Sequence, residues 1–371
     1  MKVYLVGGAI RDRLLDRLVQ ERDWVVVHSS PEEMMVQGFI PVGKAFPVFL
    51  HPQTKEEYAL ARTERKVGPG YHGFSFHTAK DVSLKDDLAR RDLTINALAE
   101  DETGNLIDYY GGLDDLKQRI LRHITPAFSE DPVRVLRVAR FAARYAYLGF
   151  QVAPETLTLM HHMGAQKELS YLVPERVWAE WESALGEQNP SVFFKVLQEA
   201  GVLNELFPLL SECPHLERAL DELDRIAADK PDLTVRFAVF MHYLLRAETF
   251  NADLENLVNT YKIPNAYQDL ALGLQQALPY YQRLDFKVAE SILDFYQAID
   301  AHRRFDRAMK LLGTCALIDS AKKLAPLKRI FEDLHTFKIN IPEDLKGSAI
   351  ADYIQQQRLL KLQSYQISGF P

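Results

Sequence analysis

The chain has 371 residues, of which 47% are hydrophobic, so it can bury a large core and favours two or three domains over one. No apolar run approaches the roughly 18 residues of a membrane helix, and the first residues do not form a signal peptide, so we expect a cytoplasmic protein without a membrane partner. The net charge of −7 argues against a polyanionic partner. Residues 1–150 nevertheless carry 21 basic and 21 acidic side chains, so a local basic face for RNA is not excluded.

The first thirty residues predict a strand, a glycine turn, a helix and a second strand. An apolar run at residues 3–6 leads into Gly7 and Gly8, and Arg11 follows. A strand that breaks at glycines before a helix leaves backbone N–H groups aimed at one point, which suits a phosphate, and Arg11 adds a permanent positive charge. The spacings of a dinucleotide-binding loop and of a P-loop are both absent, which argues against a dehydrogenase and a P-loop enzyme.

The second predicted strand begins with two carboxylates, Glu21 and Asp23. Because strand side chains alternate in direction, we expect both acids on one face and Arg22 on the other. Paired carboxylates beside a phosphate cradle can hold Mg²⁺ together with a triphosphate. Each signal alone is usually structural, but their order and short separation favour a nucleotidyl-transfer site.

The predicted strands crowd the first third of the chain, and helical spacing dominates from about residue 131 onward. We expect an α+β fold, in which a small mixed sheet is followed by a helical body. Segments rich in turn-forming residues suggest boundaries near 125–131, 187–190 and 210–215. The expected strands are residues 2–6, 24–27, 46–50, 57–62 and 104–107.

A second motif, in residues 90–99, places paired arginines before a capping Asp92 and a predicted short amphipathic helix. A guanidinium can bind phosphate oxygens through two hydrogen bonds, which makes Arg91 a candidate ligand of a triphosphate. Local sequence gives equal weight to the alternative that Arg91 only pairs with Asp87 or Asp92.

A third motif, in residues 130–140, predicts a helix start with an acid and a proline in the first turn. Asp131, Arg134 and Arg137 fall near one face, where a carboxylate and a guanidinium can address the Watson–Crick edge of a base. Taken alone, this segment rather favours the alternative of a solvated helix face with acid–arginine pairs. The two cysteines, Cys213 and Cys315, match no metal-binding spacing and are expected to be buried free thiols.

Together the three motifs resemble those of bacterial class II tRNA nucleotidyltransferases, the CCA-adding enzymes of the DNA polymerase beta superfamily. The resemblance covers residues 1 to about 210. Its motifs here are Gly7-Gly8-x-x-Arg11-Asp12, Glu21-x-Asp23, Arg91-Asp92 with Asn96, Gly111-Gly112-Leu113-Asp114-Asp115-Leu116, Glu130-Asp131-x-x-Arg134 and Pro174-Glu175-Arg176-Val177.

The resemblance implies template-independent addition of C, C and A to the 3′ end of tRNA from CTP and ATP. It implies that Mg²⁺ at Glu21 and Asp23 supports attack of the tRNA 3′-hydroxyl on the α-phosphate, with release of pyrophosphate. Asp131 and Arg134 would act in place of template bases. The implied nucleotide-binding residues are Gly8, Arg11, Arg91, Arg137 and Arg140, together with Asp131 and Arg134.

The resemblance also implies a division into three parts. We expect a nucleotidyltransferase head domain at residues 1–125, a nucleotide-selecting neck at 126–210, and a tRNA-binding body and tail at 211–371. The expected partners are tRNA, CTP and ATP, without DNA, and we expect a monomer. Longer relatives carry a His-Asp phosphohydrolase in the C-terminal half, but here Tyr243 follows His242, so we expect a degenerate region without that activity.

Two features keep alternatives open. Glu21 stands where the family usually has Asp, so a catalytically inactive tRNA-binding homologue is the non-enzyme alternative. The glycine-rich residues 66–73 resemble the loop that helps to switch specificity from C to A, which favours full CCA addition over a CC-only enzyme, although an ordinary surface hairpin has the same composition. A poly(A) polymerase is disfavoured because the chain lacks an N-terminal extension and an arginine-rich end.

Overall fold

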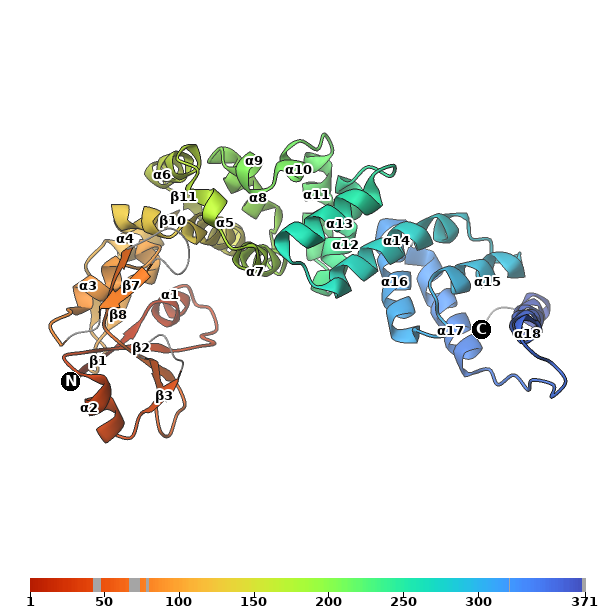
Figure 1. Cartoon of the computed structure of the whole chain (residues 1–371), viewed down its shortest axis with the longest axis horizontal. Coiled ribbons are helices and arrows are strands. Elements are labelled where there is room, and N and C mark those ends of the chain that lie inside the picture. Colours follow the sequence, from red (N-terminus) through yellow and green to blue (C-terminus); the bar gives the residue numbers. More distant parts are fainter. Residues whose placement is uncertain (43–47, 67–73, 78–79, 320, 369–371) are drawn as a thin grey trace. The chain divides into compact units, whose positions relative to one another are not determined.

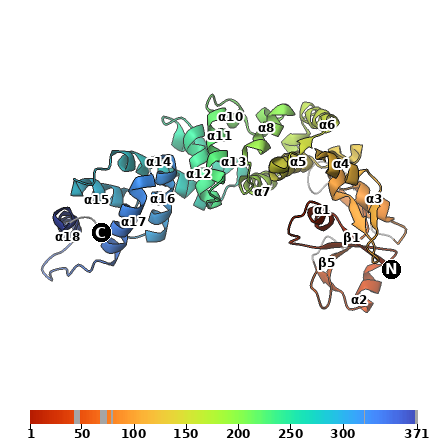
Figure 2. The same ribbon diagram turned by 180° about the vertical axis from the view of Figure 1, so that it is seen from behind.

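The structure is a computed structural model that describes residues 1–42, 48–66, 74–77, 80–319 and 321–368. The chain forms two compact units, Met1–Glu212 and Cys213–Pro371. The strands gather in the N-terminal part of the first unit, and the second unit is built from helices (Figures 1 and 2). Among the described residues, no helix has both the length and the apolar character needed to cross a membrane.

The bounds of the elements follow the chain. The strands are β1 (Lys2–Val6), β2 (Asp23–Val27), β3 (Ile40–Val42), β4 (Val48–Leu50), β5 (Glu57–Leu60), β6 (Thr63–Lys66), β7 (Phe74–His77), β8 (Leu98–Glu100), β9 (Leu106–Asp108), β10 (Ile120–Leu121) and β11 (Gln151–Val152). The helices of the first unit are α1 (Gly8–Leu14), α2 (Pro31–Val36), α3 (Leu84–Ala89), α4 (Gly112–Gln118), α5 (Val133–Tyr145), α6 (Pro154–Ala165), α7 (Pro174–Leu185), α8 (Ser191–Glu199), α9 (Leu203–Leu206) and α10 (Pro208–Ser211). Those of the second unit are α11 (Leu216–Ala227), α12 (Leu233–Leu244), α13 (Phe250–Tyr261), α14 (Asn265–Arg283), α15 (Ala289–Ala298), α16 (Phe305–Ile318), α17 (Leu324–Thr336) and α18 (Ser348–Ser368).

The main sheet has the strand order β3-β4-β5-β2-β1-β8-β9. It is mixed, because β2 and β5 run parallel whereas the other neighbours pair antiparallel. On one face, Val25 and Val27 pack with Leu88 of α3. On the other face two separate clusters form, one with Ile10 of α1 and one with Met34 of α2. Helices therefore cover both faces of the sheet. Helix α3 covers one face, and α1 and α2 cover different strands of the other face.

The predicted α+β fold is confirmed, with a mixed sheet followed by helices. The prediction of a short helix after Asp92, within residues 90–99, is wrong. Only one 3-10 turn forms there, at Thr94–Asn96, and the chain continues as strand β8 between β1 and β9. The reason is that Ala97 and Ala99 face one hydrophobic cluster and Leu98 faces the other, so alternating burial in the sheet outweighs helix propensity.

Helix α5 organises the rest of the first unit. It buries Val135, Leu136, Val138 and Ala139 completely and packs against α7 and α8. Its arginines therefore project from the remaining faces of the helix. Beyond it, Trp181 of α7 packs edge to face against Phe194 of α8 and against Phe207 between α9 and α10, which closes a second core.

In the second unit α12 is the central helix and packs against α11 and α14. Phe237, Phe240 and Met241 are fully buried on it, which explains why its sequence is apolar on nearly every face. Both cysteines are free thiols. Cys315 is buried, but Cys213 is only half-buried, and its S–H donates to the Leu244 carbonyl at the end of α12.

Candidate active site

A cavity of about 430 Å³ lies in the first unit where the turn after β1, residues 90–96 and the start of α5 meet. Most of the residues predicted from sequence line it, although they come from distant parts of the chain. Only Glu21 and Arg140 of that set do not. The predicted residues that line the cavity are Gly8, Arg11, Asp23, Arg91, Asp131, Arg134 and Arg137.

The glycine turn allows the backbone to approach an arginine closely. Gly7 has φ +74°, a left-handed conformation that favours glycine, and a Cβ there would lie 2.7 Å from Nη1 of Arg91. The Gly7 N–H donates to the Leu98 carbonyl, which joins the turn to β8. The turn therefore needs glycine both for its backbone angle and for the space that Arg91 occupies.

Arg11 is buried and held in one direction. Its guanidinium donates to both carboxylate oxygens of Asp12 at 3.0 Å and to the side-chain oxygen of Asn96. It also lies over the rings of Phe141 and Tyr145, 5.5 and 5.2 Å from their centres. Burial raises the pKa of Tyr145 to about 12, and its hydroxyl donates to Asp12. Arg11 is thus a fixed positive charge at the cavity wall.

Arg91 lines the cavity and also pairs with Asp87, as one of the two alternatives from the sequence expected. It pairs with Asp87 at 3.7 Å, and its Nη1 donates to the Asn96 carbonyl at 3.4 Å. Its Nε is buried without a hydrogen-bond partner among the described residues. Burial is the main reason that the pKa of its guanidinium is lowered. An anionic ligand in the cavity would relieve that cost of burial.

Asp92 connects the head to α5. Burial acts to raise the pKa of its carboxyl, but Arg137 and the Asn96 amide outweigh burial and hold that pKa well below its usual range. The contact is direct, with Arg137 Nε 2.7 Å from Asp92 Oδ2. The same charge of Asp92 raises the pKa of Arg137. Asp92 therefore acts as a buried anion that orients Arg137.

Arg140 lies behind the cavity wall rather than in it. It binds Glu180 of α7, which also lies 3.8 Å from Arg137. Its guanidinium is 4.5 Å from the ring centre of Phe141, and Phe141 lines the cavity. The structure therefore places Arg140 within the same side-chain network but not on the cavity surface.

Asp131 is bound through two hydrogen bonds by a residue to which sequence reasoning gave no role. Arg176, in the first turn of α7, donates to its two oxygens at 3.3 and 3.0 Å. Arg134 is 8% exposed and donates to the carbonyls of Ala127 and Arg90. The alternative of a solvated helix face is therefore wrong for this segment. The signal for Arg176 was its place in the Pro174-Glu175-Arg176-Val177 motif.

The carboxylate pair is arranged differently from the prediction. Strand β2 begins at Asp23, so Glu21 lies before the strand and not on a shared strand face. Asp23 borders the arginine-lined cavity and also a neighbouring pocket of about 520 Å³ that contains Glu21 and Glu57. Glu57 is Asp23's partner in the β2–β5 register. Sequence reasoning missed Glu57, because only strand pairing brings it beside Asp23.

These exposed acids have the chemistry of a divalent-metal site, since hard cations prefer carboxylate oxygens. Among the described residues, no three or more His, Cys, Asp and Glu side chains converge on one point where they could hold a metal ion. Asp23 nevertheless borders the arginine-lined cavity, where a nucleotide's phosphates would complete the oxygen ligands. The donor set therefore fits a metal ion that binds together with a nucleotide.

The sequence also singled out the glycine-rich segment 66–73 and the His242–Tyr243 pair. Of the glycine-rich segment 66–73, residues 67–73 lie outside the described residues. His242 and Tyr243 lie side by side on α12, where burial lowers the pKa of His242 and Arg218 lies over the Tyr243 ring.

Comparison with known proteins gives consistent matches over the whole chain. Residues 3–122 match the family model of the poly A polymerase head domain, and residues 149–213 match that of the probable RNA and SrmB-binding site of polymerase A. A CCA-adding enzyme of Coxiella burnetii (strain RSA 493 / Nine Mile phase I) is 46% identical over 97% of this chain and 94% of its own length.

Solved structures share the fold. The Bacillus stearothermophilus CCA-adding enzyme in complex with CTP has a TM-score of 0.70 and 24% identity, covering 98% of this chain and 89% of its own. The Thermotoga maritima CCA-adding enzyme complexed with tRNA has a TM-score of 0.67 and 21% identity, covering 98% and 86%.

Proposed function

The chain belongs to the family of CCA-adding enzymes, and we propose that it adds C, C and A to the 3′ end of tRNA from CTP and ATP, with release of pyrophosphate. The observation that carries the proposal is the cavity in which Arg11, Arg91 and Arg137 surround a space bordered by Asp23. Bacterial tRNA matures in the cytoplasm, so we propose that location, and we propose a monomer.

We propose that the arginines bind the triphosphate and that Asp131 and Arg134 select the base. A carboxylate accepts hydrogen bonds and a guanidinium donates them, so this pair can match the edge of a base without a template. Gly8 lets the backbone approach the phosphates. Arg140 supports the site through Glu180 and Phe141.

In the proposed reaction the tRNA 3′-hydroxyl loses its proton to solvent water and its oxygen attacks the α-phosphate, the bond to the β-phosphate oxygen breaks, and pyrophosphate leaves. Glu21 and Asp23 would hold Mg²⁺, with Glu57 nearby; when bound, the ion lowers the pKa of the hydroxyl and stabilises charge on the phosphate. Arg11 and Arg91 supply fixed positive charge for the departing pyrophosphate. No covalent intermediate with the protein is needed.

We propose that residues 1–125 form the catalytic head, 126–210 the nucleotide-selecting neck, and 211–371 a body and tail with a degenerate His-Asp region that binds tRNA. This division is supported by the site, whose described residues all lie in the first unit. The second unit would then bind tRNA, mainly through the shape and the sugar–phosphate backbone of the RNA.

The test is extension of tRNA that lacks its 3′ end, with Mg²⁺ and with CTP, ATP or both, and with products resolved to single nucleotides. Three additions that need both nucleotides support the proposal. Arrest after two residues indicates a CC-only enzyme, and a long A ladder indicates a poly(A) polymerase. No extension with tRNA binding retained indicates an inactive homologue.

A further inference from the structure

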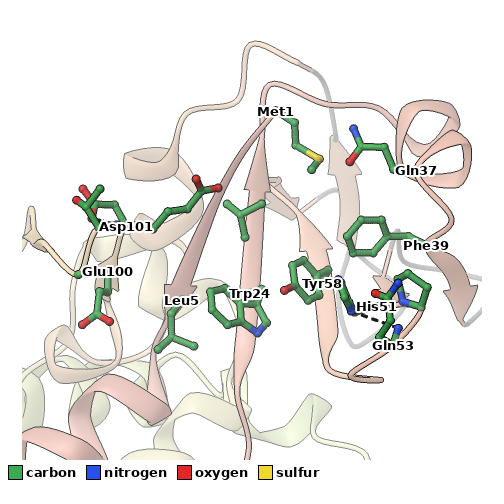
Figure 3. A pocket seen from close by; sticks show the side chains of 15 residues that line it. Met1, Leu5, Trp24, Gln37, Phe39, His51, Gln53, Tyr58, Glu100 and Asp101 are labelled. Atoms are coloured by element: carbon green, nitrogen blue, oxygen red, sulfur yellow. Dashed lines mark hydrogen bonds between the residues drawn. The ribbon is translucent and has the colours of Figure 1, made fainter.

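The head carries a third cavity, of about 820 Å³, on the sheet face opposite Asp23. We name it the sheet trough and define it by its floor of Leu5, Trp24 and Tyr58 on β1, β2 and β5. It lies on the opposite face because side chains alternate along β2, so Trp24 points away from Asp23. Figure 3 shows these residues side by side, with Glu100 and Asp101 on one side and Gln37, Phe39, His51 and Gln53 on the other.

The floor of the trough is apolar, and its central ring, Tyr58, is stacked between two other rings. Trp24 and Tyr58 stack with ring centres 5.5 Å apart, and Tyr58 and His51 stack at the same distance. Because β5 lies between β2 and β4, Tyr58 has Trp24 on one side and the His51 ring on the other. Both faces of Tyr58 are therefore occupied by its neighbours, so this central ring offers a ligand only its edge.

The walls of the trough differ in chemistry. One wall is the β8–β9 turn, which brings Glu100, Asp101 and Glu102 to the trough. Glu100 is already paired with Arg13 of α1, so Asp101 and Glu102 supply the negative charge of this wall. Hydrogen bonds from Asn105 and Thr103 lower the pKa of Asp101 to about 2, so it is anionic at neutral pH. The opposite wall presents uncharged amides. Apart from the terminal amine of Met1 and the His51 imidazole, the described lining contains no basic group.

We propose that the sheet trough is a docking site for an extended basic and apolar peptide segment of a partner protein. Apolar side chains of the segment would bury the exposed parts of Trp24 and Leu5. Its Lys or Arg side chains would meet the acidic wall, and the amides of Gln37 and Gln53 would bond its backbone. The occupant follows from charge complementarity, because an acidic wall beside an apolar floor attracts cationic side chains.

Single-stranded RNA is the competing occupant, and two observations disfavour it. Stacking on aromatic side chains needs a free ring face, and those of Tyr58 are covered on both sides. Phosphates would also approach the carboxylates of Asp101 and Glu102, whereas RNA sites usually present positive charge along the backbone. The same charges distinguish the trough from the arginine-lined cavity on the other side of the sheet.

The direct test uses Trp24 as a reporter in the full chain. The other two tryptophans, Trp178 and Trp181, are 6% and 0% exposed, so a bound peptide should change the fluorescence of Trp24 alone. The probe is a labelled octapeptide of alternating lysine and leucine. Peptides with glutamate in place of lysine, or serine in place of leucine, are the controls. We expect saturable binding only by the lysine–leucine peptide, weakened by salt.

Variants distinguish peptide binding in the trough from non-specific electrostatic attraction to the protein. Trp24→Phe should abolish the fluorescence change while the labelled peptide still binds. Glu102→Lys, at an exposed position, should weaken peptide binding about fivefold. Glu199→Lys makes the same charge change at an exposed position of α8 outside the trough lining and should have no such effect. None of the three should change nucleotide addition to tRNA.

Four results would overturn the proposal. They are absence of any binding, equal binding by the glutamate peptide, equal loss in Glu102→Lys and Glu199→Lys, and competition of a labelled oligo(A) with the lysine–leucine peptide for the Trp24 signal. A concentration-dependent dimer that buries Trp24 without peptide would assign the trough to a second copy of the chain instead.

Discussion

The contact between Asp131 and Arg176 fixes the orientation of the carboxylate that we propose selects the base. Two donors of one guanidinium reach its two oxygens, a geometry that lysine cannot reproduce. We predict that Arg176→Lys lowers kcat/KM for correct nucleotides about 30-fold, which corresponds to about 2 kcal/mol, and raises misincorporation. Single additions with each of the four nucleotides measure both. Arg246→Lys, at an exposed position after α12, is the control, and unchanged selectivity in Arg176→Lys would contradict the role.

The three acids around β2 should differ in importance. Asp23 alone borders both cavities, so we predict that Asp23→Asn lowers transfer at least about a thousandfold while tRNA still binds. Glu57→Gln should lower it less, because Glu57 borders only the outer pocket. Glu21→Asp should keep or raise the rate. Titration of rate against Mg²⁺ for each variant checks this, and equal activity of wild type and Asp23→Asn would rule out the site.

The lowered pKa of Asp92 indicates how acid destabilises the first unit. Its pKa in the folded chain lies below its ordinary value, so its contribution to stability is present at neutral pH. That contribution is lost as pH falls below about 4, since the unfolded chain then takes up the proton first. We predict that the free energy of unfolding falls between pH 5 and pH 3, less steeply in Asp92→Asn. Urea unfolding at both pH values measures the slopes, and parallel slopes would contradict it.

At the scale of elements, local patterns predicted β1 and the glycine turn, because both depend on neighbouring residues. They failed at residues 97–99, where burial between two clusters makes a strand of a segment with helical composition. Glu57 could not be found from its own surroundings, because only the β2–β5 register brings it beside Asp23. The pairing of Asp131 with Arg176 spans 45 positions and depends on how α7 packs against α5.

The start of α4 gives a test of close packing between elements. A Cβ at Gly112 would lie 2.3 Å from the Thr94 carbonyl oxygen, within the turn that leads into β8. We predict that Gly112→Ala lowers the free energy of unfolding of the first unit by about 1–3 kcal/mol, because backbone must move. Gly313→Ala is the control, since nothing lies within 4 Å of its Cβ and α16 should gain slightly. Thermal unfolding compares both variants, and equal midpoints would contradict the packing argument.

At the scale of the whole chain, acidic residues are in excess only beyond residue 150, the part that contains the proposed tRNA-binding body. A polyanion should therefore meet locally basic surfaces there and not a uniformly positive one. Lys328 and Arg329 are exposed neighbours on α17 and make one such surface. Glu332 is exposed on the same helix, so opposite changes of charge can be made on one element.

If α17 contacts tRNA, we predict that the double variant Lys328→Glu with Arg329→Glu weakens tRNA binding and lowers the salt slope of log affinity by about 1–2, since each phosphate contact contributes about one. Glu332→Lys should act in the opposite direction. Binding of tRNA measured at several salt concentrations gives both slopes, and addition of a single C at saturating tRNA shows whether the active site is intact. If both variants bind tRNA with the wild-type slope, this face of α17 lies away from tRNA, because a surface that contacts phosphates cannot reverse its charge without changing the number of ions released.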